Sequence, residues 1–332
     1  MNIAPHILAN GNWISMASFM ELALYDEDEG YYSKNIPGIG FRGDFSTAAT
    51  MSSLPARCIV NLWRKSCKEA GTRLPIIEIG GGNGDMAMAI RREFSLWEKM
   101  FTKYIMVDRS NALRNLQRMV AGTAVSVYSS MEKALKRVGG KAFIFSNELP
   151  DAFPARQFVF QRGEWLELGL AVIDGHVIRQ ADKQPLPASS AFNFWAKEGQ
   201  VIEVHESYAK WFAEWQKHWK SGVMLTIDYG QTVEKLYYRR PAGSLRGYKA
   251  HTLLSADELA PLAGRCDITA DVNFTDLINM AKGCHDDIVH YMSQRGFMAP
   301  LADMNKPEDR HLIAEGGAGE YFNVMVHHRF QL

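Results

Sequence analysis

The sequence has few cysteines, and their spacing does not build a metal site. Four cysteines stand in 332 residues, and no two of them have the C-x-x-C spacing that is typical of zinc sites. We predict that they are buried apolar side chains or reduced thiols, which favours a reducing compartment. The adjacent His327 and His328 would point to opposite faces of a predicted strand, so they are poor joint metal ligands.

The chain also lacks a charge excess and long apolar runs. Lys and Arg number 37, and Asp and Glu number 37, so the formal net charge is zero. Proteins that bind nucleic acid usually carry a basic excess, so no nucleic-acid partner is expected. No apolar run approaches the roughly 18 residues that span a bilayer, and the first fifteen residues contain no Lys or Arg, unlike a targeting segment. The sequence therefore predicts a soluble cytoplasmic protein without membrane insertion.

Short apolar strands alternate with helices from about residue 55. Strands are predicted at 75–79, 104–107, 124–128, 142–146, 223–227 and 322–328. Helices are predicted at 18–24, 56–70, 86–94, 111–120 and 131–138, with a Trp-rich helix that carries Trp211, Trp215 and Trp219 as core residues. This alternation predicts an α/β fold, with a parallel sheet covered by helices on both faces.

The rhythm of the pattern divides the chain into four parts. Residues 1–54 form an N-terminal extension, in which the glycine-containing segment 34–52 is expected to act as a lid. Residues 55–152 form the first part of the core. Residues 153–200 are an insertion with hairpin strands at 157–160 and 165–173, turned at Gly163 and at Asp174-Gly175. Residues 201–332 complete the core and supply substrate-side elements.

The most informative stretch is the glycine loop Glu78 to Gly84. Gly80, Gly82 and Gly84 follow a strand and precede a helix, so the backbone can approach a ligand without clashes from Cβ atoms. A dinucleotide-binding loop, G-x-G-x-x-G, would place its third glycine at residue 85, where the chain has Asp85. Asp108 ends the next strand, where a carboxylate can accept hydrogen bonds from ribose hydroxyls. Because NAD enzymes use the same device, an NAD(P)-dependent oxidoreductase stays open as an alternative.

The G-x-G-x-G loop resembles the S-adenosylmethionine (SAM) loop of class I methyltransferases. Further strings resemble the MidA-like family of these enzymes, which includes the arginine methyltransferase that assembles mitochondrial respiratory complex I. They run in family order from about residue 18 to residue 297: 24–26, 29–32, 43–48, 78–84, 147–154, 228–230, 243–251 and 267–275.

The resemblance implies a Rossmann-like class I methyltransferase sheet, SAM as the cofactor and an arginine side chain of a partner protein as the substrate. A respiratory complex I subunit is the partner that the family implies. The expected cofactor-binding residues are Asp44, Thr47, Glu78, Gly80, Gly82, Gly84, Asp108 and Asn147.

The chemistry of such a transfer requires acids. A sulfonium and a guanidinium about 4 Å apart repel by roughly 4 kcal/mol at an effective dielectric constant near 20, and carboxylates offset this repulsion while they hold the guanidinium. Glu148, on the loop after the strand 142–146, is the expected clamp. Asp151 is either a second carboxylate or an organiser of the loop, and Asp228 has the same two alternatives. His251, with Arg246 and Tyr248, is expected to shape the substrate channel.

The chain departs from the family pattern at five positions. The family usually has proline at the position of Gly81, a basic residue at Asn83, Pro-Glu at Ala49-Thr50 and an aromatic residue at Pro150. These departures leave open a second alternative, in which the protein is an assembly scaffold that retains the methyltransferase fold without catalysis.

Overall fold

The computed structural model describes residues 1–35, 52–194, 196–283 and 287–329. Asp44 and Thr47, two of the expected cofactor ligands, lie outside the described residues, as do the departures Ala49 and Thr50 and most of the expected lid.

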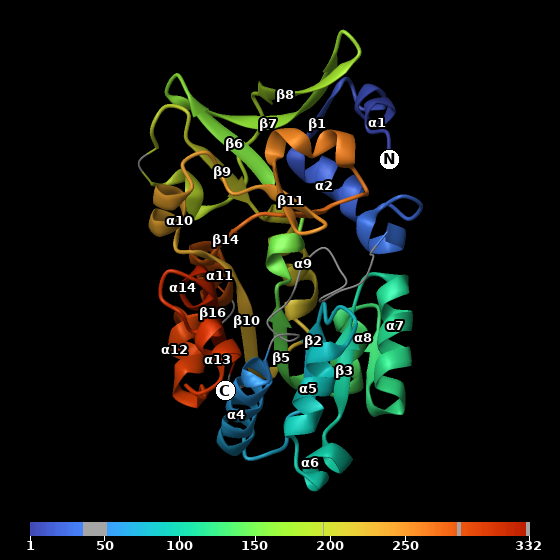
Figure 1. The fold of residues 1–332 in the computed structure, drawn as a ribbon, viewed down its shortest axis with the longest axis vertical. Coiled ribbons are helices and arrows are strands. Elements are labelled where there is room, and N and C mark those ends of the chain that lie inside the picture. Colours follow the sequence, from blue (N-terminus) through green and yellow to red (C-terminus); the bar gives the residue numbers. More distant parts are fainter. Residues whose placement is uncertain (36–51, 195, 284–286, 330–332) are drawn as a thin grey trace.

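A mainly parallel sheet forms the core of the protein (Figure 1). Its strand order is β15-β16-β10-β5-β2-β3-β4, and the short β14 (Val272–Asn273) pairs with β10. The five strands from β10 to β4 are mutually parallel. Strand β16 runs antiparallel to β10, and β15 runs antiparallel to β16. Their bounds are β2 (Ile76–Ile79), β3 (Tyr104–Val107), β4 (Ser126–Tyr128), β5 (Lys141–Asn147), β10 (Ser221–Gln231), β15 (Ile288–Ser293) and β16 (Phe322–Arg329). The predicted α/β fold is confirmed.

Alternate side chains of each strand build two cores, one on each face of the sheet. On β5, Phe143 and Phe145 face a core shared with α4 (Leu54–Glu69), α5 (Asp85–Glu93) and α12 (Gln294–Met298). Ala142 and Ile144 face the opposite core, which is shared with α8 (Met131–Arg137), α9 (Glu206–Gln216) and α11 (Phe274–Lys282). This two-residue alternation on strands with helices on both faces is the pattern of a doubly wound sheet. The remaining helices of the core are α6 (Leu96–Phe101), α7 (Asn111–Ala121), α13 (Pro307–Leu312) and α14 (Ala318–Tyr321).

An antiparallel sheet stands at the other end of the molecule (Figure 1). Its order is β1-β7-β6-β9, with β8 on β7; the bounds are β1 (Trp13–Ser15), β6 (Arg156–Gln161), β7 (Glu164–Ile173), β8 (His176–Asp182) and β9 (Val201–Val204). The predicted hairpins, with turns at Gly163 and at Asp174-Gly175, are confirmed, and all three turn residues have positive φ. The sheet takes β1 from the N-terminal segment and β9 from beyond residue 200, so it extends past the expected insertion.

Smaller elements connect the two sheets. Helices α1 (Ala4–Ala9) and α2 (Met16–Tyr25) pack with β7 and with the three-stranded sheet β12-β11-β13 in a third core. The strands of that sheet are β11 (Arg246–Lys249), β12 (Thr252–Ser255) and β13 (Asp267–Thr269), and α10 (Val233–Arg239) lies beside β9. A helical turn at Tyr31–Asn35 follows α2.

The direction of the chain crossovers reverses between β2 and β5. From β2 the chain moves outward to β3 and β4, and β5 then returns to the other side of β2. In such sheets, ligands bind beyond the carboxyl ends of the strands at the point of reversal. The glycine loop, Asp108 and Glu148 all follow strands at this edge.

None of the helices in the described part of the chain is both long enough and apolar enough to cross a bilayer. Two of the four cysteines, Cys58 and Cys266, are buried, as predicted.

Candidate functional site

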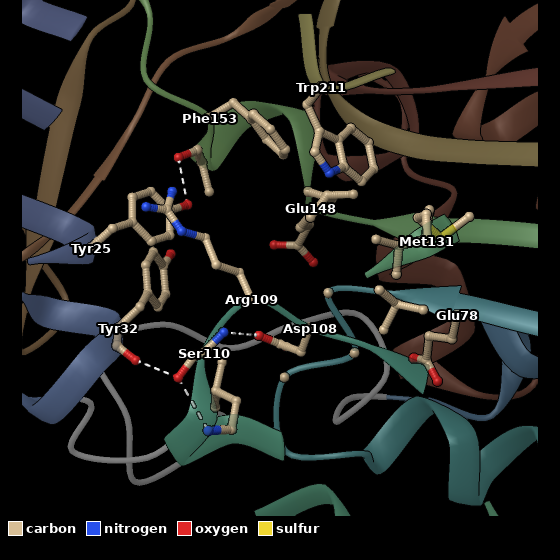
Figure 2. A pocket seen from close by; sticks show the side chains of 18 of the residues that line it. Tyr25, Tyr32, Glu78, Asp108, Arg109, Ser110, Met131, Glu148, Phe153 and Trp211 are labelled. Carbon is tan, nitrogen blue, oxygen red and sulfur yellow. Dashed lines mark hydrogen bonds between the residues drawn. The ribbon is translucent and has the colours of Figure 1, made fainter. Parts of the chain in front are cut away.

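A cavity of about 690 Å³ lies at the carboxyl edge of β2, β3 and β5. Its walls come from six places: the glycine loop, the residues that follow β3, residues 129–131 after β4, the loop after β5, helix α9, and the N-terminal segment with Tyr25 and Tyr32. Figure 2 shows the Glu148 carboxylate pointing into this space, between Phe153 and Trp211 on one side and Asp108 on the other. The cavity therefore joins the core to the N-terminal extension.

The glycine loop forms the floor of the cavity beside β2. Gly80 and Gly82 line the cavity and have φ of 66° and 53°, which a residue with a Cβ atom adopts only with strain. Gly84 also has a positive φ, but it stands at the N-cap of α5 and is not among the residues that line the cavity. Gly80 and Gly82 are thus placed for a ligand, whereas Gly84 starts the helix.

Asp108 is held in place beside the glycine loop. Its two carboxylate oxygens accept hydrogen bonds from the Ser110 amide at 2.9 Å and from Gln117 Nε2 at 3.1 Å. Gln117 Nε2 also donates to the Gly82 carbonyl at 2.9 Å, so one side chain fixes both the acid and the loop. Burial raises the pKa of Asp108 to about 6, because the ionised form loses solvation.

Sequence reasoning missed Gln117, which is fully buried. A polar residue on the inward face of the amphipathic helix α7 is a signal that could have identified it, since buried amides need partners.

Glu78 lines the cavity from within β2 and is almost fully buried. The Tyr104 hydroxyl donates to Glu78 Oε2 at 2.8 Å. Burial raises the pKa of Glu78 to about 7, although this hydrogen bond opposes the shift. A ligand that donates hydrogen bonds or brings positive charge would favour the ionised form of this carboxyl.

Glu148 occupies a strained backbone position directly after β5. Its φ is 54°, which is uncommon for a residue other than glycine and is typical of functional sites. Its amide donates to the Ile227 carbonyl at 2.9 Å, and Asn147 Nδ2 donates to its Oε1 at 3.0 Å. Burial, followed by the negative charge of Asp151, raises the pKa of Glu148 to about 8. The site thus holds a carboxyl whose ionised form would be stabilised by a nearby cation.

Asp151 and Asp228 lie behind Glu148 and outside the wall of the cavity. Asp228 accepts hydrogen bonds from the amides of Tyr229 at 2.7 Å and Asp151 at 3.2 Å. Asp151 Oδ2 accepts a hydrogen bond from the Thr269 hydroxyl at 2.8 Å. Burial raises the pKa of both acids, that of Asp151 to about 6. Of the two alternatives for these residues, the geometry favours the organisation of the loop that carries Glu148.

His251 is not brought to the cavity. It stands in the exposed turn between β11 and β12, with φ of 62°. Arg246 lies closer to the site: its guanidinium is 5.6 Å from the Tyr229 ring centroid, and the Tyr229 hydroxyl is 3.5 Å from Glu148 Oε2. The strand that carries Arg246 therefore reaches the site, whereas the turn after it does not.

Aromatic side chains that sequence reasoning did not assign to the site complete the cavity. Phe153 and Trp211 have ring centroids 5.2 Å apart. Trp215 and Trp219 are buried, and the half-buried Trp211 packs against the same core, so the prediction that the three tryptophans pack in the core is confirmed. Trp211 also lines the cavity. The i, i+4 spacing gave no sign of the contact with the cavity, because Trp211 stands in the middle of α9 and this contact depends on what the helix meets after folding.

The N-terminal segment closes the opposite wall. The Tyr25 hydroxyl donates to the Ala152 carbonyl at 2.9 Å, and the Arg109 guanidinium, paired with Glu21, lies 4.6 Å from the Tyr25 ring centroid. The Ser110 hydroxyl donates to the Tyr32 carbonyl at 2.8 Å. Both tyrosines belong to strings that carry the family resemblance, which is the signal that could have placed them in the site.

Three departures from the family pattern fit the local packing. A Cβ atom at Gly81 would lie 2.3 Å from Met106 Cε, so the Met106 side chain fills the space of a larger residue. Asn83 hydrogen-bonds through both side-chain atoms to Asp85 and orders the start of α5. Pro150 begins a short 3₁₀ turn, Pro150–Ala152, at the position where a proline is tolerated.

Comparison with known proteins identifies relatives over most of the chain. The model of a family described as "Putative S-adenosyl-L-methionine-dependent methyltransferase" matches residues 54–291. The curated relatives include the mitochondrial protein arginine methyltransferase NDUFAF7 of Bos taurus, at 24% identity, and that of Rattus norvegicus, at 25%. Each match covers 81% of this chain and 66% of the relative, so the chain spans about two thirds of the length of these proteins.

A crystal structure of a Burkholderia thailandensis protein bound to S-adenosyl-homocysteine is similar throughout. It is 25% identical, has a TM-score of 0.86, and the match covers 98% of this chain and 90% of that one. A second, native structure from the same organism, at 24% identity and a TM-score of 0.81, shows the same fold. Within the described residues, no group of three or more His, Cys, Asp and Glu side chains could hold a metal ion.

We predict that Gly82→Val abolishes the binding of SAM and of S-adenosyl-homocysteine. The branched side chain would project at the cavity wall from a backbone with φ of 53°. Titration calorimetry should show at least a hundredfold loss of affinity, and the parent protein should not bind NAD. Gly71→Val is the matched control, because Gly71 has φ of 61° and is exposed in the turn after α4. Equal losses in both variants would show that backbone strain alone causes the effect.

We also predict that Glu148→Gln makes stability less dependent on pH. The pKa of Glu148 in the fold, about 8, lies above its value of about 4.3 in an unfolded chain. The stabilising contribution of the protonated form is therefore complete below about pH 4.3 and is lost as the pH rises through 8. Without ligand, the midpoint of thermal unfolding should fall between pH 6 and pH 9 by on the order of 5 °C more in the parent than in the variant.

The control for this measurement is Glu214→Gln, which changes an exposed acid at the mouth of the same cavity. It should follow the parent. Parallel pH curves for the parent and Glu148→Gln would contradict the raised pKa.

Proposed function

The chain belongs to the MidA-like family of SAM-dependent methyltransferases, and we propose that its methyl acceptor is an arginine side chain of a partner protein. The observation that supports this acceptor best is the Glu148 carboxyl, half-buried at the carboxyl end of β5 and directed into the cavity. The arginine methyltransferases among the relatives of similar sequence agree with this choice. The family resemblance makes a respiratory complex I subunit the partner to test first.

The residues of the cavity fit SAM. Gly80 and Gly82 open the floor, and Asp108, fixed by Ser110 and Gln117, is placed to accept hydrogen bonds from ribose hydroxyls. Asn147 Oδ1 is buried at the cavity and has no hydrogen-bond partner among the described residues, so it can accept a hydrogen bond from a ligand. When bound, SAM supplies a methyl group on a sulfonium and leaves as S-adenosyl-homocysteine.

The negative charge of ionised Glu148 would offset the repulsion between the sulfonium of SAM and the guanidinium of the acceptor. A guanidinium stays protonated at any accessible pH, and the Glu148 carboxyl, with its pKa raised to about 8 in the ligand-free site, is largely neutral at pH 7. A nearby cation lowers this pKa, so we expect Glu148 to ionise as the guanidinium enters. The two carboxylate oxygens can then hold the guanidinium fork and direct one nitrogen toward the methyl group.

We expect the same carboxylate to have a second role, because the transfer releases a proton. The guanidinium nitrogen forms a bond to the methyl carbon as the carbon–sulfur bond breaks, and the electron pair of that bond stays on sulfur. The attacking nitrogen then loses a proton. We expect Glu148 to accept this proton and to release it to solvent through the cavity that its carboxylate faces.

The aromatic walls support the binding of cations. Phe153, Trp211 and Tyr25 line the cavity, and an aromatic face attracts a desolvated cation with about 2 kcal/mol. Arg109 already uses one such face, that of Tyr25. The combination of one ionisable carboxyl with aromatic walls is suited to a cationic acceptor.

We predict that Glu148→Gln separates cofactor binding from transfer. The variant should bind SAM almost as tightly as the parent, whereas single-turnover transfer of a labelled methyl group should fall roughly 100- to 1000-fold, or by about 3–4 kcal/mol of transition-state stabilisation. A lysate from cells that lack the protein supplies the acceptor, and acid hydrolysis identifies the methylated residue. Glu214→Gln should retain the parental rate.

Four other outcomes would contradict the proposal. Unchanged transfer would remove Glu148 from the mechanism, and lost SAM affinity would move it to the cofactor. A labelled methyl group on a residue other than arginine would show that arginine is not the acceptor. If the parent binds SAM but labels nothing in the lysate, while complex I assembly depends on it, the protein is a scaffold.

A further inference from the structure

The edge of the core opposite the cavity carries the densest group of exposed apolar side chains on α6. Leu96, Trp97, Met100 and Phe101 are 80%, 68%, 71% and 54% exposed. The helix buries none of its six residues, so these side chains do not serve the core. Figure 1 shows α6 projecting from the end of the molecule that lies farthest from the antiparallel sheet. We name these four side chains the α6 patch.

Local contacts hold the α6 patch in a fixed conformation, although its side chains are exposed. Ser95 and Glu98 form a capping box at the start of the helix, and the rings of Trp97 and Phe101 stack with centroids 5.4 Å apart. The Glu98 carboxylate also pairs with Arg64 through bonds of 2.7 and 2.8 Å, which lowers its pKa to about 2. The one acid of the helix is therefore neutralised, and the apolar face is presented in a fixed conformation.

Positive charge surrounds the α6 patch. Residues 64–73 and 91–103, which form and flank this end, contain eight Lys and Arg and three Glu, although the whole chain is neutral. Arg73 lies 5.8 Å from the centroid of the Phe101 ring. Arg73, Lys99 and Lys103 are exposed and form no ion pair within the described parts of the chain.

The parallel sheet extends this basic edge. Four strands of the parallel sheet begin at or just after a cationic residue. Arg73 precedes β2, Lys103 precedes β3, Lys141 begins β5 and Lys220 precedes β10. All four side chains are exposed. Because the strands are parallel, these cations lie at one edge of the sheet, and the cavity lies at the other.

We propose that this edge is a docking surface for an anionic phospholipid bilayer, with the α6 patch inserted among the lipid headgroups. A projecting helix that presents Trp, Phe, Leu and Met within a ring of Lys and Arg has the composition of an interfacial membrane contact. Transfer of the apolar side chains out of water would lower the free energy of binding, and the negative surface potential of the lipid would attract the cations. A protein docked in this way directs its cavity away from the bilayer.

The test is co-sedimentation of the full chain with vesicles. We expect binding to mixed phosphatidylcholine–phosphatidylglycerol vesicles, which weakens as salt is added, and little binding to phosphatidylcholine alone. Trp97→Ser/Met100→Ser should lower the affinity for mixed vesicles by roughly tenfold or more. Lys99→Gln/Lys103→Gln should lower it by roughly ten- to thirtyfold.

The matched control is Tyr238→Ser/Leu253→Ser, which removes two other exposed apolar side chains, 87% and 61% exposed, from α10 and β12. It should bind vesicles like the parent. SAM affinity should be unchanged in every variant, which shows that the fold is intact.

Two results would overturn the proposal. One is no sedimentation of the parent with anionic vesicles, or sedimentation that all variants share. The other is concentration-dependent self-association, seen by light scattering, that Trp97→Ser/Met100→Ser abolishes without any vesicle binding by the parent. That result would assign the α6 patch to a second copy of the chain.

Discussion

The burial of acids at the carboxyl edge of the sheet is the constraint on which the site depends. Glu78, Asp108, Glu148, Asp151 and Asp228 all have a raised pKa because burial removes their solvation. Asp228 lowers this cost by accepting two amide hydrogen bonds, and it thereby shapes the loop on which Glu148 stands. Glu148 accepts hydrogen bonds from Asn147 Nδ2 and from the Tyr229 hydroxyl, but its pKa stays raised to about 8, so its ionised form still needs further compensation. A cationic ligand would provide it, which connects the fold of the loop to the chemistry of methyl transfer.

The sequence predicted those parts of the site that depend on local pattern. The loop glycines, the acid at the end of the next strand and the alternation of β and α elements are fixed by steric and hydrogen-bonding rules that act over a few residues. Gln117 and Trp211 could not be assigned in this way, because their roles depend on which neighbour a helix face meets after folding. Gln117 meets a carbonyl and a carboxylate on two different strand ends.

The antiparallel sheet shows the same limit on a larger scale. Its hairpins were predicted from turn residues, but the pairing of β1 with β7 joins Ile14 to Leu170 across more than 150 residues. The fit is close: a Cβ atom at Gly169 would lie 2.3 Å from the Ile14 carbonyl oxygen. Such a contact depends on tertiary packing, and no pattern near either strand indicates it. The family resemblance, by contrast, rests on strings distributed along the chain, and the family match confirms it.

A crystal structure with S-adenosyl-homocysteine would show whether the methyl group of SAM faces Glu148. We predict that the ribose hydroxyls contact the Asp108 carboxylate, that the amino-acid end lies over Gly80 and Gly82, and that the sulfur faces Glu148 with room for a guanidinium between them. A sulfur that faces away from Glu148, or a ribose that does not touch Asp108, would contradict this placement of SAM.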